Sequence, residues 1–409
     1  MKVGIVGGGA AGMCAAIALA PRVEVHLFEG QDRVGKKLLT TGNGRCNILN
    51  GHPRPEKFHG SAMEIPQKIL SRYDRETLEE FFQGLGLLLA RDERDRLYPA
   101  SFQASTVVNL FLHHLEARGV QVHTKTRISK IRPKSRGFLL GSKEEEFFCD
   151  VLLLTTGGRA APKTGSDGAG YALAKGLGHE VGEILPSLVQ LESPWPHLRH
   201  LKGTKIDTTV RLLIDGRETQ QAEGELLFTD YGLSGPPVLD LSRAAVVALA
   251  REKDVKIQVR LLASGIQGGE EAVENLLYAM WNDSLEDFLR GVLHKKLHVI
   301  LSRMFGVGLE ERVGDLSEEK RRELLGLLQG VEIPISNHHG FSAAQTTCGG
   351  VLFEDLDENL ESRLHPGLYF AGELLDVDGD CGGLNLHWAF ASALCAADAI
   401  GNGIEGMSQ

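Results

Sequence analysis

The first thirty residues carry a glycine spacing that suits phosphate binding. An apolar run at residues 3–6 leads directly into G-x-G-x-x-G, with Gly7, Gly9 and Gly12 at the fixed positions. In a strand–turn–helix unit the first glycine permits a tight turn and the second lets the backbone approach a pyrophosphate. The third lets the helix, expected over residues 11–20, pack against the strand with its N-terminus facing the phosphates. This spacing predicts a dinucleotide site.

Glu29 adds a group that can recognise a sugar. A second apolar run, residues 23–28, ends at this residue, and a carboxylate in this place can accept hydrogen bonds from an adenosine ribose. Strand, glycines, helix, second strand and acidic residue therefore follow one another in the order of a nucleotide-binding unit. The unit alone does not separate NAD from FAD.

A second glycine-rich segment, GKKLLTTGNGRCN, follows at residues 35–47. It contains Arg45 and two lysines, and we expect a loop that is too irregular for a strand or helix. Long loops of this kind are usually functional or disordered, and the glycines favour close approach of the backbone to a ligand. The alternative is a plain surface loop.

Two later segments consist of an apolar run that ends in small residues: residues 151–154 lead into TTGG, and residues 367–373 read GLYFAGE. A third segment, GGLN at residues 382–385, opens a helix close to the end of the chain. The N-terminus of that helix would stabilise an anion. Only a long ligand would contact segments that lie so far apart in the sequence, and this favours FAD. No second dinucleotide unit is predicted for NAD(P)H, which could act as a transient electron donor.

The remaining elements must hold these segments together. The first unit predicts an α/β fold with a parallel, Rossmann-like sheet. Between residues 186 and 259 short strand-like runs alternate with turn signals such as Asp215-Gly216, which predicts a small β-rich domain. Helical spacing at residues 271–281, 285–305 and 317–328, with start signals at Ser284 and Ser317, predicts a helical insertion. Strand character returns at residues 331–335.

Composition limits the class of protein. A chain of 409 residues usually forms two or three domains, and no apolar run reaches the roughly 18 residues of a membrane span. We therefore expect a cytoplasmic protein. Its six cysteines lack C-x-x-C spacing, which predicts reduced thiols and no metal site.

The net charge of −10 disfavours wholesale binding of nucleic acid. Two basic clusters nevertheless remain as candidates for contact with phosphates, at residues 118–136 and 290–303. The alternative is that both are solvated protein surface.

Taken together, GGGAAG, GKKLLTTGNGRCN, GELLFTDYGLSGPPVLDLS and GLYFAGELLDVDGDCGGLNLHWAF resemble the three-domain bacterial FAD flavoproteins. That family includes an aminoacetone oxidase, a flavin reductase of bile-acid metabolism and a 23S rRNA dihydrouridine synthase. The resemblance implies an FAD domain of glutathione-reductase type at residues 1–186 and 346–409. It also implies a β-rich, substrate-side domain at residues 187–260 and 331–345 and a helical insertion at residues 261–330.

The resemblance also implies which residues hold FAD. The ADP half would lie on Gly7, Gly9, Ala10, Ala11, Gly12 and Glu29. The pyrophosphate and flavin would contact Lys37, Thr41, Gly42, Gly44, Arg45, Cys46 and Asn47. Gly157, Gly372, Glu373, Gly383, Leu384 and Asn385 would complete the site.

A bound flavin supplies hydride chemistry, so the protein must hold it, tune it and offer a proton. Cys46, Cys381 and His387 are the candidate proton donors, and for each the alternative is a packed side chain. The leading hypothesis is an FAD-dependent oxidoreductase that transfers hydride to or from a small molecule. The alternatives are an rRNA dihydrouridine synthase and a non-enzymatic flavin-binding redox sensor, in which Cys46 or Cys381 would respond.

Overall fold

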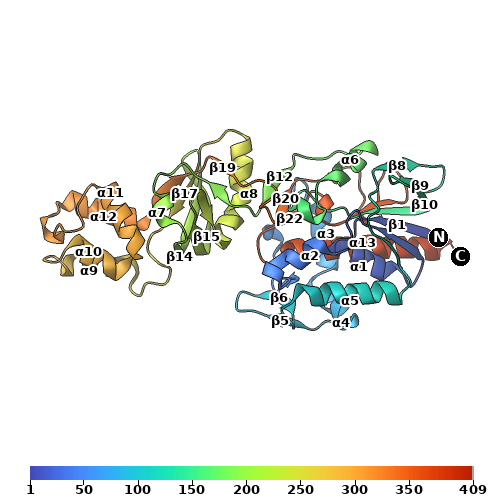
Figure 1. The fold of residues 1–409 in the computed structure, drawn as a ribbon, viewed down its shortest axis with the longest axis horizontal. Helices are drawn as coiled ribbons and strands as arrows, with labels where there is room; N and C mark the ends of the chain where they lie inside the picture. Colours follow the sequence, from blue (N-terminus) through green and yellow to red (C-terminus); the bar gives the residue numbers. More distant parts are fainter. Residues whose placement is uncertain (408–409) are drawn as a thin grey trace. The chain divides into compact units, whose positions relative to one another are not determined.

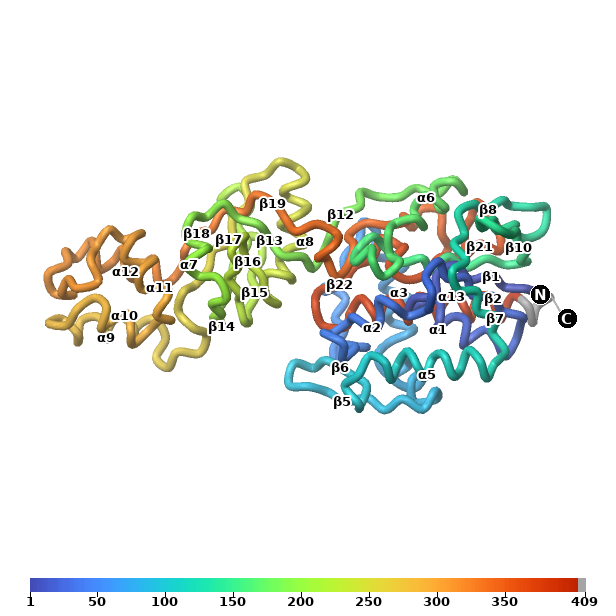
Figure 2. The backbone as a smooth tube through the Cα atoms, in the orientation of Figure 1, coloured from blue at the N-terminus to red at the C-terminus, as the bar shows by residue number. Residues whose placement is uncertain are grey.

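The computed structural model describes residues 1–407, with side chains through residue 403. The chain divides into two compact units (Figures 1 and 2), which are described separately below. Unit 1 comprises Met1–Ser187 and Ala344–Gln409, and unit 2 comprises Leu188–Ala343. The predicted division into three domains stays a prediction, because unit 2 contains both the β-rich and the helical segments.

A five-stranded parallel sheet forms the centre of unit 1. Its order is β21–β11–β1–β2–β7, and β1 (Lys2–Val6) pairs in register with β11 and β2, so that Val3 lies beside Val151 and Val25. The other strands are β2 (Glu24–Phe28), β7 (Gln121–His123), β11 (Val151–Leu154) and β21 (Leu368–Phe370). The apolar strands β1, β11 and β21 are buried on both faces, as parallel strands usually are, whereas the edge strand β7 is largely exposed.

The last helix of the chain packs against the first. Helix α1 (Ala10–Leu19) is almost entirely buried, and it contacts α13 (Leu384–Met407) over much of its length. Figure 2 shows the C-terminal segment, in red, running among the N-terminal elements, in blue. Because β21 and α13 join the sheet and helix layer begun by β1 and α1, the two ends of the chain form one core.

The remaining elements of unit 1 cover this core. An antiparallel sheet of β8 (Lys130–Pro133), β9 (Phe138–Gly141) and β10 (Glu146–Cys149) contacts β1. Helices α3 (Glu64–Arg72), α4 (Arg75–Gly84) and α5 (Ala104–Ala117) contact α13 or α1, and α6 (Ala169–Gly176) follows β11 in the chain. Smaller antiparallel groups are β3 (Leu49–Asn50) with β6 (Arg96–Pro99) and β5 (Leu89–Arg91), β4 (Phe58–His59) with β22 (Asp378–Gly379), and β12 (Leu185–Ser187) with β20 (Thr346–Cys348).

Unit 2 contains a seven-stranded antiparallel sheet. Its order is β18–β17–β14–β15–β16–β13–β19, and the long hairpin of β14 (Lys205–Ile214) and β15 (Arg217–Phe228) closes at Asp215-Gly216, as the turn signal predicted. The shorter strands are β13 (Leu191–Glu192), β16 (Gly232–Ser234), β17 (Val255–Val259), β18 (Val331–Pro334) and β19 (Asn337–His338). Helix α8 (Pro236–Ala250) packs on the sheet, and α7 (Leu198–Leu201) precedes β14.

Four helices form the rest of unit 2: α9 (Gly269–Ala279), α10 (Leu285–Val292), α11 (Lys295–Phe305) and α12 (Glu318–Gln329). The predicted start signals are confirmed, because Ser284 and Ser317 accept hydrogen bonds from backbone N–H groups three residues on. The single helix expected over residues 285–305 is wrong. Leu293 and His294 are extended, and the imidazole of His294 caps a new helix.

No helix in residues 1–407 is both long and apolar enough to cross a membrane.

Candidate functional site

The turn after β1 contains two glycines, Gly7 and Gly12, at which the fold leaves no space for a side chain. Gly7 has φ 112°, in the left-handed region, and a Cβ there would overlap the carbonyl of Thr155. A Cβ on Gly12 would overlap the carbonyl oxygen of Gly7. The Thr155 hydroxyl also donates to the Gly7 carbonyl at 2.8 Å. These two glycines therefore let α1 and β11 approach the turn closely.

Gly9, the middle glycine of the motif, has a different environment. It caps α1 with φ −83°, and a Cβ built on it would meet no atom within 4 Å. The fold thus needs no glycine here for steric reasons. The open space lies at the N-terminus of α1, where unpaired N–H groups favour a phosphate, so the residues present fit the pyrophosphate of a dinucleotide.

Glu29 is fixed beside this turn. Its carboxylate accepts hydrogen bonds from the backbone N–H groups of Gly8, at 2.9 Å, and Gln31, at 2.7 Å. An ionised carboxylate has about four acceptor sites, so two remain for ribose hydroxyls. The position of Glu29 at the end of β2 fits the sugar contact that the sequence predicted.

The expectation of an irregular loop at residues 35–47 is wrong for its first part. Residues Lys36–Thr40 form helix α2, and Thr41–Gly44 form a 3₁₀ turn. Leu38 is buried, and α2 contacts α5. This short helix therefore has a packing partner, which the glycines on either side of it do not indicate. The Gly35 N–H donates to the Gly8 carbonyl at 2.8 Å and so joins α2 to the first glycine turn.

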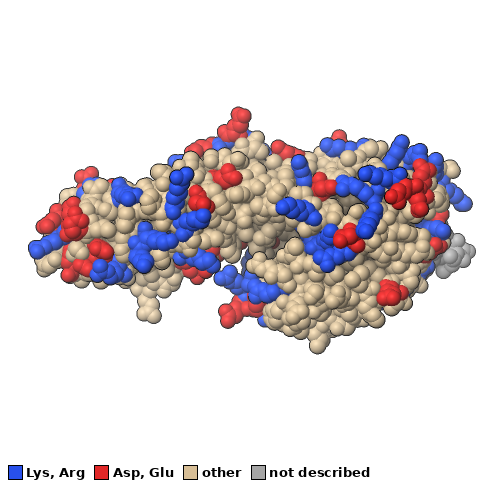
Figure 3. All heavy atoms as spheres, viewed as in Figure 1, with Lys and Arg blue, Asp and Glu red and all other residues tan. Residues whose placement is uncertain are grey.

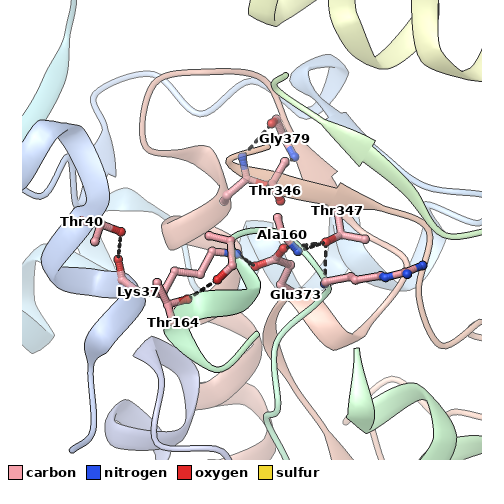
Figure 4. A network of polar contacts seen from close by, with 11 residues as sticks. Lys37, Thr40, Ala160, Thr164, Thr346, Thr347, Glu373 and Gly379 are labelled. Atoms are coloured by element: carbon pink, nitrogen blue, oxygen red, sulfur yellow. Dashed lines mark hydrogen bonds and ion pairs between the residues drawn. The ribbon is translucent and has the colours of Figure 1, made fainter. Parts of the chain in front are cut away.

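An ion pair links α2 to the segment after β21. Lys37 Nζ lies 2.6 Å from Glu373 Oε2, and both side chains are largely but not fully buried. The other oxygen of Glu373 accepts a hydrogen bond from the hydroxyl of Thr347 at 3.0 Å. Figure 4 shows the Glu373 carboxylate between Lys37 and Thr347.

Thr347 itself is held by the turn that follows β11. Its hydroxyl oxygen accepts hydrogen bonds from the backbone N–H groups of Arg159, at 2.8 Å, and Ala160, at 3.1 Å. Because the Thr347 hydroxyl has one proton, these two contacts direct that proton toward Glu373. Three chain segments thus determine the orientation of one carboxylate.

The start of α13 lies against residues 47–50. Gly382 and Gly383 have φ 123° and 94°, and a Cβ on Gly383 would lie 2.6 Å from the Leu49 carbonyl oxygen. With its amide oriented to pair donors with acceptors, Asn47 accepts from the Gly383 N–H and donates to the Leu49 carbonyl, both at 3.0 Å. Asn50 Nδ2 donates to the Gly382 carbonyl at 2.9 Å.

The first turn of α13 is further fixed by Asn385. Its Oδ1 accepts from the Gly379 N–H at 2.9 Å and from the Thr346 hydroxyl at 3.2 Å, and its Nδ2 donates to the Gly379 carbonyl at 2.7 Å. The polar atoms of Asn385 are therefore engaged within the protein. The helix N-terminus, with its first-turn N–H groups, is what remains to face an anion.

The structure brings most of the predicted FAD residues into unit 1 as contacting groups. Gly372 lies against Ala11, Gly157 lies beside Ser166, the Arg45 guanidinium lies 5.3 Å from the Tyr98 ring centre, and the Cys46 N–H donates to the Thr41 carbonyl. Gly44 has open space where a Cβ would be, as Gly9 has. The assignment of these residues to FAD remains a prediction.

The three predicted proton donors differ in accessibility. Cys46 is fully buried, and burial raises the pKa of its thiol to about 12. His387 is also fully buried, and burial lowers the pKa of its imidazole to about 4. Neither ring nitrogen of His387 has a hydrogen-bond partner within the described part of the chain. Cys381 is half-buried in the turn before α13.

Sequence reasoning missed Thr347 and a second pair, His59 and Asp380. His59 Nε2 lies 2.8 Å from Asp380 Oδ1, and both side chains are about one quarter exposed, at 26% and 27%. His59 and Asp380 are 321 residues apart in the sequence, so no local pattern signals their contact. The acidic alternation of Asp376, Asp378 and Asp380 was the available clue.

Comparison with known proteins places these features in context. A family model described as "HI0933-like protein Rossmann domain" matches residues 1–399. A 3-dehydro-bile acid delta(4,6)-reductase of Clostridium scindens is 33% identical over 97% of this chain and 98% of its own. A ribosomal RNA dihydrouridine synthase of Escherichia coli is 28% identical over 97% of each chain. Among solved structures, a flavocytochrome c3 fumarate reductase gives a TM-score of 0.49 at 14% identity, over 98% of this chain and 78% of its own.

Gly9 and Gly12 should respond differently to the same substitution. Gly12→Ala should lower the free energy of unfolding of the FAD-free protein by about 1–3 kcal/mol, because the new methyl group overlaps the Gly7 carbonyl. Gly9→Ala should change that stability by less than about 0.5 kcal/mol and weaken FAD binding by about tenfold or more, about 1.4 kcal/mol. Urea unfolding and fluorescence titration with FAD measure the two effects. Wild-type FAD affinity in Gly9→Ala would contradict the assignment of this space.

His387 should make unit 1 sensitive to acid. Burial lowers its pKa from 6.5 to about 4 in the folded state, so the unfolded chain binds the proton more readily between these values. The contribution of neutral His387 to the free energy of unfolding is therefore fully present above about pH 6.5. This contribution, on the order of 3 kcal/mol, is lost as pH falls toward about 4. Urea unfolding across this window should show a shallower loss for His387→Leu. An identical pH dependence in the variant would rule out His387 as the source.

Proposed function

The chain belongs to the HI0933-like family of Rossmann-domain proteins, and on that premise we propose that this FAD-dependent oxidoreductase reduces a conjugated carbon–carbon double bond in a small molecule. Membership confirms the predicted family and the Rossmann-type α/β class. The observation that carries the proposal is the assembly, in unit 1, of one glycine-lined polar surface from both ends of the chain.

The residues present fit FAD in the order of its parts. The open space at Gly9 and the N-terminus of α1 would take the pyrophosphate, and Glu29 would take the ribose of the ADP half. The Lys37–Glu373 pair joins α2, which Gly35 connects to the first glycine turn, to the segment Gly372–Leu374, which contacts α13, and we assign the ribityl chain to this pair. The N-terminus of α13 would stabilise negative charge on the ring system. FAD supplies the hydride chemistry when bound, and these side chains bind and orient it.

The choice of substrate class rests on the C. scindens relative, which is named as a reductase of a 3-dehydro bile acid. A 3-dehydro bile acid carries a ketone, and a delta(4,6) system is conjugated with it, so hydride addition generates an enolate that the protein must protonate. We extend this reaction type, but not the particular bile acid, to the present chain. The proposed electron donor is NADH or NADPH, bound transiently. The proposed location is the cytoplasm, in keeping with the absence of disulfides among the six cysteines.

A basic surface in unit 2 favours a second candidate, reduction of a uracil ring in ribosomal RNA. Exposed Arg199 and Lys202 lie at α7, and exposed Lys295, Lys296 and Arg303 lie on α11. We call these five residues the α7–α11 basic surface. Figure 3 shows Lys and Arg gathered on this face of unit 2, around the place where Figure 1 labels α7.

Contacts within this surface hold the two elements together. Lys296 Nζ donates to the Lys202 carbonyl at 3.0 Å, and Arg303 Nη1 lies 3.5 Å from His200 Nε2. The neighbouring Trp195 packs edge-on against His197, at 5.0 Å between ring centres. A row of cations beside an aromatic ring suits a single-stranded polyanion. The Lys202–Asp230 ion pair, at 2.7 Å, partly offsets the positive charge.

Anaerobic flavin absorbance tests the leading proposal. NADH or NADPH should bleach the bound flavin, and a steroid with a 3-keto group conjugated to a double bond should then restore the absorbance in proportion to the steroid added. Mass spectrometry should show that the steroid gains two hydrogens. The saturated 3-ketosteroid is the control and should restore nothing. Failure of every conjugated ketone to reoxidise the flavin would refute the proposed substrate class.

RNA binding tests the second candidate. The triple variant Lys295→Gln, Lys296→Gln, Arg303→Gln should make the dependence of log K on log salt less steep by about 2 for a single-stranded rRNA fragment. The matched control removes three exposed charges from unit 1 outside both basic clusters, as Lys68→Gln, Lys143→Gln, Lys175→Gln. An equal change in both variants, or no salt dependence in the wild type, would argue against the α7–α11 basic surface as an RNA site.

A further inference from the structure

We propose that His59 is the proton donor of this site and that Asp380 orients it. The inference rests on the proposed function, because a proton donor is needed where hydride addition leaves a carbanion or enolate. It goes beyond that function by assigning the acid to a residue that the sequence pattern does not indicate. His59 and Asp380 both belong to unit 1.

The backbone places His59 beside the turn that starts α13. Strand β4 pairs antiparallel with β22, so that His59 lies opposite Asp378 and Phe58 lies opposite Gly379. The next residue, Asp380, donates its N–H to the Lys57 carbonyl at 3.0 Å. Residues 380–383 then lead directly into α13, whose N-terminus is the proposed position of the flavin ring. His59 is therefore fixed within one short turn of that position.

The two side chains of β4 point in opposite directions, as alternate residues of a strand do. Phe58 is buried and meets the ring of His387 edge-on at 6.2 Å. His59 lies on the other face and is only partly buried. It can therefore recover a proton from water, whereas Cys46 and His387 are enclosed in the core.

Each of the three alternating aspartates has a different partner. Asp376 accepts from the N–H and the hydroxyl of Ser61, and buried Asp378 accepts from the hydroxyl of Ser187 at 3.0 Å. Asp380 Oδ1 lies 2.8 Å from Nε2 of the His59 imidazole. A carboxylate on one ring nitrogen fixes the tautomer and the ring orientation, as it does in catalytic His–Asp pairs.

The proton balance follows from this geometry. In the imidazolium form of His59, Nε2–H donates to Asp380 and Nδ1–H faces away from it. Reduction adds a hydride from the reduced cofactor to one carbon of the double bond. The Nδ1–H bond then breaks as a C–H bond forms at the other carbon, which leaves a neutral imidazole with Nε2–H still bound to Asp380. Water returns the proton, and a reduced nicotinamide restores the two electrons.

A purely structural pairing of β4 with β22 would give the same contacts, so the test needs readouts that such a role would not change. The first readout uses no substrate. In 15N-histidine-labelled holoenzyme, the ring resonances of His59, assigned by their loss in His59→Gln, should shift when dithionite reduces the flavin. His52, which is 65% exposed and lies 3.7 Å from Asp95, should show no shift. An unshifted His59 would overturn the proposal whatever the substrate is.

The second readout is the rate at which a conjugated ketone oxidises the reduced enzyme. His59→Ala should slow this step by about 10²–10⁴-fold, the usual contribution of a general acid, with the rate of reduction by NAD(P)H unchanged. Added imidazole should restore part of the loss in His59→Ala but not in His59→Gln, where the side chain fills the space. Asp380→Asn should slow the same step, and His52→Ala should not.

The outcomes separate the two proposals. If no conjugated ketone oxidises the wild-type enzyme, the proposed function fails, and the resonance shift still decides whether His59 lies at the flavin. If the wild type is oxidised and His59→Ala is equally fast, the proton-donor assignment fails while the proposed function stands. A slow His59→Ala that imidazole rescues supports both.

Discussion

The close contact between the start of α13 and the backbone of residues 47–50 is the constraint on which the site depends. Gly382 and Gly383 have left-handed backbone conformations, and a side chain on Gly383 would meet the Leu49 carbonyl. Asn47 and Asn50 bind the same two glycines through their amides. The contact fixes where the helix N-terminus points, and thereby where negative charge on a ligand is stabilised. The turn at residues 380–383, which carries Asp380, is positioned by the same contact.

The order of strands in the central sheet explains how residues so distant in sequence share a site. Strand β1 pairs with β2 and β11, and β11 pairs in turn with β21, so the carboxyl ends of early and late strands lie on one edge. Lys37 and Glu373 meet there at 2.6 Å. The site therefore forms only when the C-terminal elements β20, β21 and α13 are folded against the N-terminal ones, although the dinucleotide motif lies within the first thirty residues.

Short sequence patterns predicted the turns and helix caps that depend on neighbouring residues. The Asp215-Gly216 hairpin and the Ser284 and Ser317 caps depend on residues within a few positions, and the structure has a hairpin or cap at each. The predicted turn at Gly7–Gly12 is present too, although Gly7 and Glu29 are fixed by contacts with Thr155 and Gly8, which lie 148 and 21 positions away. Helix α2 was missed because it is stabilised by contact with α5 and by burial of Leu38, and glycine-rich spacing in the segment does not signal either. The break at Leu293–His294 was missed because apolar spacing continues across it. The Thr347–Glu373 and His59–Asp380 contacts join segments 26 and 321 residues apart, and spacing cannot specify such pairs.

Unit 2 leaves unit 1 after Ser187 and returns just before Thr346, and these two residues lie opposite each other in the β12–β20 pair. The 156 residues between Leu188 and Ala343 thus occupy the place of a hairpin loop. Nothing in the order of the parallel strands has to change when that segment is lengthened, shortened or exchanged. The insertion therefore adds 156 residues of protein at a single pair of chain crossings, after Ser187 and before Ala344, and leaves the parallel sheet of unit 1 continuous.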